Sequence, residues 1–104
     1  VIANHTWNHP NLNKSSGIDW DRQITKPNLV LEKITGRKVE YFAYPHGEKN
    51  DSVIQELKKR GIKLAFQLTK RQNDKEPMYT VRRLLITGNM SPSMLYKRMQ
   101  GAFR

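Results

Sequence analysis

The strongest constraint on the fold is a strand–helix–strand unit in the middle of the chain. Residues 39–44 are mainly β-branched or aromatic, which is typical of a buried strand. A helix then runs from a cap at Asn50 or Asp51 to a stop at Gly61. Residues 62–69 form the next strand, and the inner face of the helix consists of Val53, Ile54 and Leu57. Short links between these elements predict parallel neighbouring strands joined by a right-handed crossover.

A longer helix is predicted upstream of this unit. Asp19 is a suitable N-cap and Gly36 a suitable stop, and Pro27 should kink or divide the helix because proline has no backbone N–H. Apolar residues recur every three or four positions and form a stripe that we expect to pack on a sheet: Trp20, Ile24, Pro27, Leu31 and Ile34. Residues 1–3 are apolar and predict a buried strand at the beginning of the chain.

The last third of the chain continues the alternation of strands and helices. Residues 81–87 predict a strand, and Ser91 followed by Pro92 predicts the start of a final helix. We expect its inward face to consist of Leu95 and Met99, with Ala102 as a further candidate. The alternation predicts an α/β layer whose strand C-termini lie along one edge, where such sheets bind their ligands.

Length and composition limit the domain organisation and exclude some classes of site. The 104 residues suffice for at most one domain. Because the chain begins inside a predicted strand and lacks an initiator methionine, we expect it to be the later portion of a larger domain. It contains no cysteine, which excludes disulfides and thiolate metal sites. It also has no run of about 18 apolar residues, which a membrane-spanning helix would need.

The net charge of +10, from 19 basic and 9 acidic residues, would attract polyanions. The basic clusters are scattered along the chain, and no zinc-finger or RNP-like motif accompanies them. Solvated lysine-rich faces explain this distribution better, so we expect no nucleic-acid partner. The alternative function is a basic module that binds nucleic acid or an anionic glycan without catalysis, with stacking surfaces at Trp7, Tyr44 and Tyr79.

Two of the three histidines, His5 and His9, lie four residues apart directly after the predicted first strand. Two imidazole ligands of a tetrahedral Zn²⁺, with Zn–N bonds of about 2.0–2.1 Å, must come within roughly 3.3 Å of each other. Positions i and i+4 are about 13 Å apart in a strand, but only about 5–6 Å apart in a helical turn. We therefore expect the strand to end near Ala3 or Asn4 and residues 5–9 to form a helical turn or tight loop. On the pattern alone, a metal site and a pair of solvent-exposed or hydrogen-bonded histidines both remain open.

Two sequence blocks resemble those of a known family. Residues 3–12, ANHTWNHPNL, resemble the His-(Ser/Thr)-x-x-His motif of the NodB-like polysaccharide deacetylases. Residues 41–47, YFAYPHG, resemble the Tyr-Pro-x-Gly active-site loop of the same family. The two blocks also occur in the right order, so the resemblance favours the metal site. It implies that residues 1–104 are one partial deacetylase domain, the second half of a distorted (β/α) barrel with the site at the strand C-termini.

The resemblance implies a metal-dependent enzyme that removes N-acetyl or O-acetyl groups from an acetylated polysaccharide of a cell wall or an exopolysaccharide, outside the cytoplasm or at the cell surface. His5 and His9 would be ligands of a divalent metal, with Zn²⁺ the first expectation, and Thr6 would support their loop by hydrogen bonding. The backbone N–H of His46 would face the oxyanion. The residues expected to bind substrate are Tyr44, Pro45 and Gly47.

The chain departs from the family's pattern in several places. It lacks the Asp-Asp pair that supplies the third metal ligand and the general base, so we expect these residues by themselves to bind metal weakly and to be inactive. Ala43 stands where many members have an arginine that orients the base, and Thr87 stands where a general-acid histidine would be expected. A degenerate, inactive carbohydrate-binding relative is therefore a third hypothesis.

Overall fold

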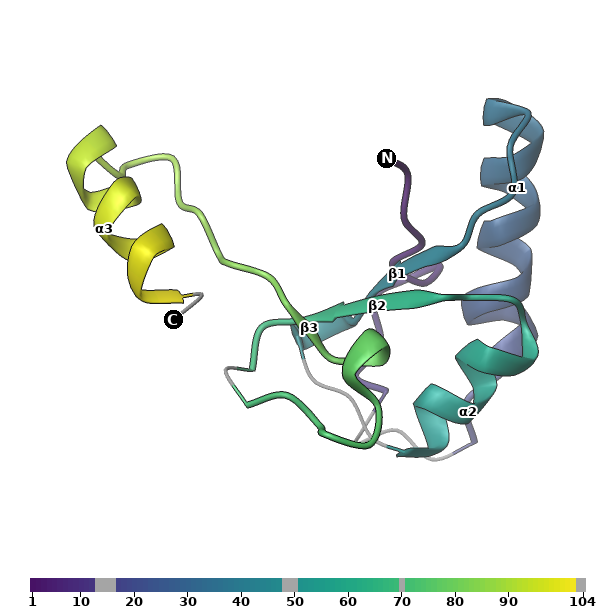
Figure 1. Ribbon diagram of the computed structural model, residues 1–104. Helices are drawn as coiled ribbons and strands as arrows, with labels where there is room; N and C mark the ends of the chain where they lie inside the picture. Colours follow the sequence, from purple (N-terminus) through teal and green to yellow (C-terminus); the bar gives the residue numbers. More distant parts are fainter. Residues whose placement is uncertain (13–16, 48–50, 70, 103–104) are drawn as a thin grey trace.

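The computed structural model describes residues 1–12, 17–47, 51–69 and 71–102. A parallel sheet consists of three short strands, in the order β1 (Tyr41–Ala43), β2 (Leu64–Gln67) and β3 (Val81–Arg82) (Figure 1). In register, Phe42 pairs with Ala65, and Phe66 pairs with Val81. Asn4 forms an isolated parallel bridge to Phe42 on the other edge of β1. The predicted parallel strand–helix–strand unit is confirmed.

Helix α2 (Asp51–Lys59) connects β1 to β2 and begins and ends close to the predicted positions. Its predicted inner face is fully buried, with 0% exposure for Val53, Ile54 and Leu57. After the helix, Gly61 adopts a left-handed conformation with φ 81°, and the N–H of Ile62 donates to the carbonyl of Leu57 at 3.1 Å. Asn50, one of the two predicted caps, lies outside the described residues.

The upstream helix changes type near Pro27 but is not broken there. A π-helical segment, η1 (Asp21–Thr25), continues directly into α1 (Lys26–Thr35), whose first turn contains Pro27. The side chain of Asp19 caps the start, and Gly36 ends the helix with φ 69°. A π turn uses i→i+5 hydrogen bonds and is wider than an α turn, so the helix accommodates the missing proline N–H without a break in the chain.

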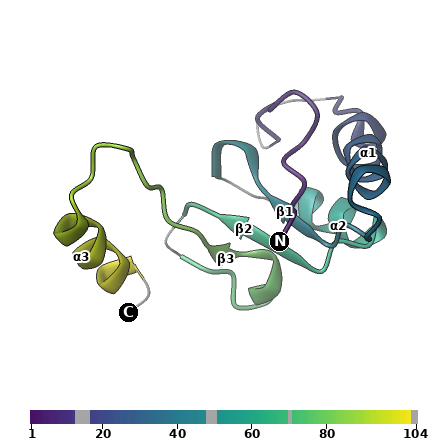
Figure 2. The same cartoon turned by 90° about the horizontal axis from the view of Figure 1, so that it is seen from above.

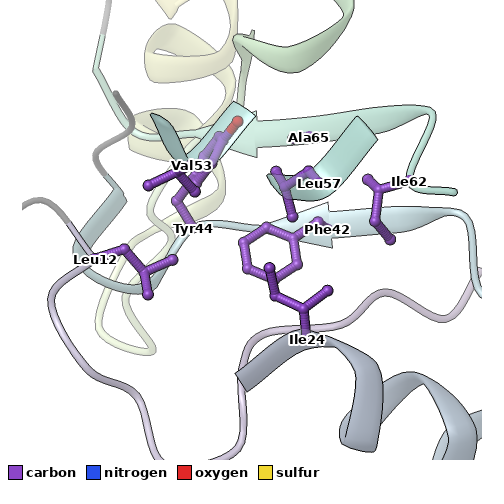
Figure 3. Packing of buried hydrophobic residues seen from close by; sticks show 8 residues of the cluster. All are labelled: Leu12, Ile24, Phe42, Tyr44, Val53, Leu57, Ile62 and Ala65. Atoms are coloured by element: carbon purple, nitrogen blue, oxygen red, sulfur yellow. The ribbon is translucent and has the colours of Figure 1, made fainter. Parts of the chain in front are cut away.

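The hydrophobic core lies between one face of the sheet and helices α1 and α2 (Figure 3). Phe42 and Tyr44 point to the same face because alternate residues of a strand do so. Ile24 of η1 and Leu57 of α2 pack against this face, and each of these side chains has 0% exposure. The remaining members of the cluster are Leu12, Val53, Ile62 and Ala65.

Two predicted strands need correction. Val1 is fully exposed and Ile2 is 51% exposed, so residues 1–3 are not a buried strand, and pairing begins only at Asn4. β3 ends at Arg82, and Leu85 is 56% exposed instead of continuing the strand to residue 87. The physical reason is the same in both places: the described residues provide no further strand with which these segments could pair.

The last helix, α3 (Pro92–Ala102), is capped as predicted but is not packed as predicted. Ser91 Oγ accepts the N–H of Met94 at 3.3 Å. In both views α3 stands apart from the sheet and from the other helices, at the end of an extended segment (Figures 1 and 2). Met99, which was expected to face inward, is 50% exposed, and Ile34 at the end of the predicted α1 stripe is 75% exposed. Within the described chain, no element covers these apolar side chains.

Candidate active site

The loop that follows Asn4 brings His5 and His9 side by side. Their ring centroids are 4.7 Å apart, and the ring planes are inclined by 70°. The segment is a tight loop, because Thr6 and His9 adopt left-handed conformations with φ 69° and 58°. Such angles are uncommon for residues other than glycine, and they reverse the chain so that the two rings meet. The structure thus has the tight loop that the spacing of the histidines predicted.

A hydrogen bond fixes the protonation pattern of His5. Its Nδ1 lies 2.7 Å from the carbonyl oxygen of Ala43, at the C-terminal end of β1. A carbonyl oxygen can only accept, so Nδ1 must carry the proton, and in the neutral ring Nε2 then has a free lone pair. Histidine ligands of metals are commonly oriented in this way by a backbone carbonyl.

The third histidine of the chain reaches the same place from another direction. His46 lies just after the end of β1, in the turn η2 (Pro45–Gly47), and its ring centroid is 4.6 Å from that of His9. Its backbone is also left-handed, with φ 61°, and its side chain is exposed. The two predicted motifs therefore meet at the C-terminal edge of the sheet, as the alternation of strands and helices predicted.

A buried polar network fixes the histidine loop to the helix behind it. Asn4 is 1% exposed, and its Nδ2 donates to the carbonyl of Ile24 at 2.9 Å and to Asn28 Oδ1 at 2.8 Å. Gln23, 7% exposed, accepts the N–H of Trp7 through Oε1 at 3.1 Å and donates to Asn8. Gln23 and Asn28 were not predicted as part of the site. The signal was available, since polar side chains at positions 23 and 28 interrupt the inward face of an amphipathic helix.

Thr6 stabilises the histidine loop through two hydrogen bonds. Its N–H donates to Asn4 Oδ1 at 2.8 Å, and its hydroxyl accepts the N–H of His9 at 3.0 Å. The hydroxyl of Thr6, the residue directly after His5, therefore holds the backbone of His9. This is the geometry that support of the loop by Thr6 would require.

The Tyr44-Pro45 part of the second motif is buried. Tyr44 has 0% exposure, and its hydroxyl donates to the carbonyl of Tyr79 at 2.7 Å, while Pro45 is below 2% exposure. These two side chains offer no surface to a ligand, so the prediction that they bind substrate is wrong for the side chains. A substrate contact in this motif would have to come from the loop backbone around His46 and Gly47. What Tyr44 does in this structure is anchor the loop in the core (Figure 3).

Burial gives Tyr44 a testable pH dependence, because it raises the pKa of the hydroxyl well above its ordinary value of about 10. A raised pKa means that stability is complete below pH 10 and is lost as the pH rises further. At neutral pH, Tyr44→Phe should lower the free energy of unfolding by about 1 kcal/mol through the lost hydrogen bond. Between pH 9 and pH 11 (about one unit either side of the ordinary pKa), urea titrations should show this difference shrinking. The exposed Tyr96→Phe should show no such trend, and a constant Tyr44→Phe difference would contradict the argument.

Arg83 supplies a cation at the same edge of the sheet. It follows β3, and its Nη2 donates to the carbonyl of Tyr44 at 3.0 Å, next to the position where Ala43 replaces the arginine of the family's pattern. Burial lowers its pKa, and its buried Nε has no hydrogen-bond partner within the described residues. In the sequence, Arg83 is one of the scattered basic residues, with no signal that links it to the site. Its position comes from the sheet order, which places β3 beyond β2.

The donor set fits part of a metal site. His5 and His9 are neighbouring imidazoles, and Nε2 of His5 is the lone-pair atom. Zinc sites that act on a substrate usually have three protein ligands and one open position. Among the described residues, no group of three His, Cys, Asp or Glu side chains is arranged to hold a metal ion. These residues can thus provide two ligands but not a complete site.

Comparison with known proteins decides the family. The sequence model described as polysaccharide deacetylase matches residues 1–65, which include both motifs, strand β1 and the start of β2. The chain belongs to the polysaccharide deacetylase family. Relatives in sequence include the chitooligosaccharide deacetylase of Azorhizobium caulinodans, 35% identical over 64 residues, which are 61% of this chain and 30% of the relative. The peptidoglycan-N-acetylglucosamine deacetylase of Bacillus cereus is 38% identical over 48 residues, 46% of this chain and 18% of the relative.

Solved structures agree with this assignment. The Streptococcus pyogenes deacetylase PplD, in complex with acetate, is 27% identical, with a TM-score of 0.75 over 93% of this chain and 43% of that chain. A Bacillus cereus polysaccharide deacetylase shares the fold at 23% identity and a TM-score of 0.78, over 95% of this chain and 32% of that one. The fold is therefore part of a deacetylase barrel. The chain spans less than half the length of each of these relatives. None of the helices in its described part has the length and apolar character needed to cross a membrane.

Proposed function

We propose that this chain forms the histidine side of the active site of a metal-dependent carbohydrate deacetylase, with His5 and His9 as ligands of a divalent metal, Zn²⁺ in the first instance. The observation that supports this most is the geometry of the two rings. They lie side by side in a family motif, and the bond from His5 Nδ1 to Ala43 leaves Nε2 as the ligand atom. A bound divalent metal would activate water and polarise the acetyl carbonyl.

The residues of the chain would fix the geometry of the site. Thr6 and Asn4 hold the histidine loop through hydrogen bonds that do not involve the imidazoles, so the loop is formed before a ligand arrives. The turn at His46 would bring its backbone N–H to the acetyl oxygen as negative charge develops there, as predicted from the motif. Preorganised donors of this kind lower the barrier because they need no rearrangement during the reaction.

The names of relatives support the proposed substrate class. Two of the relatives are named as deacetylases of chitooligosaccharide and of peptidoglycan N-acetylglucosamine. An N-acetylated glycan of a cell wall or exopolysaccharide is thus the proposed substrate, and the protein would act outside the cytoplasm or at the cell surface. Because no group of three His, Cys, Asp or Glu side chains among the described residues is arranged to hold a metal ion, residues 1–104 by themselves should bind metal weakly and release little acetate.

Metal binding can be tested through stability. Thermal denaturation with increasing Zn²⁺ should show a rise in melting temperature, since a ligand at 100 times its dissociation constant stabilises the folded state by about 2.7 kcal/mol. Changing both His5 and His9 to alanine should abolish this rise. His46→Asn is the matched control, because it removes the neighbouring imidazole and keeps a residue type that tolerates a left-handed backbone. It should retain the rise.

The same variants separate the proposal from a basic binding module. Salt-sensitive binding of a polyanion that is unchanged in the double histidine variant, with no effect of Zn²⁺, would favour the module and overturn the deacetylase. Acetate release from N-acetylglucosamine oligomers by an enzyme that contains this segment would instead exclude both the module and an inactive carbohydrate-binding relative.

A further inference from the structure

Trp7 is the large aromatic side chain of the histidine loop, and it is 45% exposed. It lies two residues from His5 and two from His9, so its Cα is at most about 7 Å from each of theirs. An indole ring that is left accessible beside a candidate catalytic site is suited to contact a ligand. Aromatic rings provide a large apolar surface whose face carries partial negative charge.

One side of the indole is already occupied. The ammonium of Lys26, in the first turn of α1, lies over the ring at 4.3 Å from its centroid. A cation in this position is attracted by the ring's quadrupole and holds the indole in one orientation. The exposed surface of Trp7 therefore belongs to the rest of the ring, away from the lysine.

The backbone of Trp7 is fixed as well. Its N–H donates to Oε1 of Gln23, which is buried, and Thr6 before it donates to Asn4. A ring held at its backbone and on one face loses little conformational freedom when a ligand binds, and such preorganisation increases affinity.

We propose that Trp7 is a stacking platform for one pyranose ring of the glycan, adjacent to the histidine pair. This inference rests on the proposed function. The C–H groups of a pyranose are polarised by the neighbouring oxygens and match the negative face of the indole. The ammonium of Lys26 occupies one face of the ring, so the sugar would stack on the remaining surface of the indole.

Tryptophan fluorescence tests the contact directly, since the chain contains only one other tryptophan, Trp20. Titration with an N-acetylglucosamine tetramer, without added metal, should shift the emission of the unmodified protein. Trp7→Phe should abolish the shift. Trp20→Phe is the matched control, because Trp20 is half-buried against the core, and it should retain the shift.

Affinity provides the second measurement. In calorimetric titrations with the same tetramer, Trp7→Ala should raise the dissociation constant about tenfold, which corresponds to about 1.4 kcal/mol. Because Trp7 is exposed, the variant should keep the circular dichroism spectrum of the unmodified protein. A shift that survives in Trp7→Phe, an unchanged dissociation constant in Trp7→Ala, or quenching by single-stranded nucleic acid instead of the sugar would overturn the platform.

The platform and the proposed function fail in different ways. Sugar binding that depends on Trp7, without zinc stabilisation that depends on His5 and His9, would support the platform and refute the metal-dependent enzyme. Zinc stabilisation together with sugar binding that is indifferent to Trp7 would refute the platform alone.

Discussion

Replacing Asn4 by alanine is expected to destabilise the protein by about 3 kcal/mol or more and to loosen the histidine loop. Asn4 is 1% exposed and makes three side-chain hydrogen bonds, to the carbonyl of Ile24, to Asn28 and from the N–H of Thr6. Each buried polar group that loses its partner costs about 1–3 kcal/mol, and alanine leaves three of them. Urea unfolding monitored by circular dichroism would show a lower midpoint.

Two further variants show whether the hydrogen bonds are the cause. Asn4→Asp keeps the shape and the acceptor for Thr6 but loses both donated bonds, so it should be destabilising as well. Asn89→Ala removes an exposed asparagine far from the loop and should change the free energy of unfolding by less than about 0.5 kcal/mol. If Asn4→Asp were as stable as the unmodified protein, the donated bonds could not be what fixes the loop. Loss of zinc stabilisation in Asn4→Asp would connect the network to the metal site.

Phe42→Ala is expected to lower the free energy of unfolding by about 3–5 kcal/mol, a range typical of aromatic truncations in protein cores. Phe42 has 0% exposure and lies in the central part of the cluster, with the Tyr44 ring edge-on at a centroid distance of 5.6 Å (Figure 3). It is also the residue through which β1 pairs with both Asn4 and Ala65. Chemical denaturation followed by tyrosine and tryptophan fluorescence measures the loss.

Leu85→Ala is the matched control for this truncation. Leu85 is also a large apolar residue, but it is 56% exposed and follows β3. Its removal should alter the free energy of unfolding by no more than about 0.5 kcal/mol. Comparable losses for Phe42→Ala and Leu85→Ala would mean that the core is not where the structure places it.

The sequence predicted those features that neighbouring residues determine. The glycines at 36 and 61 stop their helices because each can adopt a left-handed backbone, and both do so, with φ 69° and 81°. The inner face of α2 followed from the spacing of its apolar residues. The prediction of a tight loop at residues 5–9 followed from distances. Positions four apart lie close together in a turn but too far apart in a strand for two imidazoles to meet.

Features that depend on distant segments were missed. The length of β3 and the burial of residues 1–3 depend on having a strand to pair with, and an apolar sequence cannot show whether that partner is present. The packing of α3 failed for the same reason, since an amphipathic helix reveals a face but not what covers it. In the site, Gln23, Asn28 and Arg83 became visible only when the fold brought them to the histidine loop and to β1.

The left-handed backbones of Thr6, His9 and His46 limit which substitutions could stabilise these loops without loss of the site. Every non-glycine residue with a positive φ in the described chain lies in one of the two loops that carry the histidines. Glycine would relieve the backbone at each position, because it has no Cβ. Here each such exchange would delete an imidazole or the hydroxyl that accepts the backbone N–H of His9. A substitution that relaxes the backbone of either loop would therefore remove a group of the candidate active site.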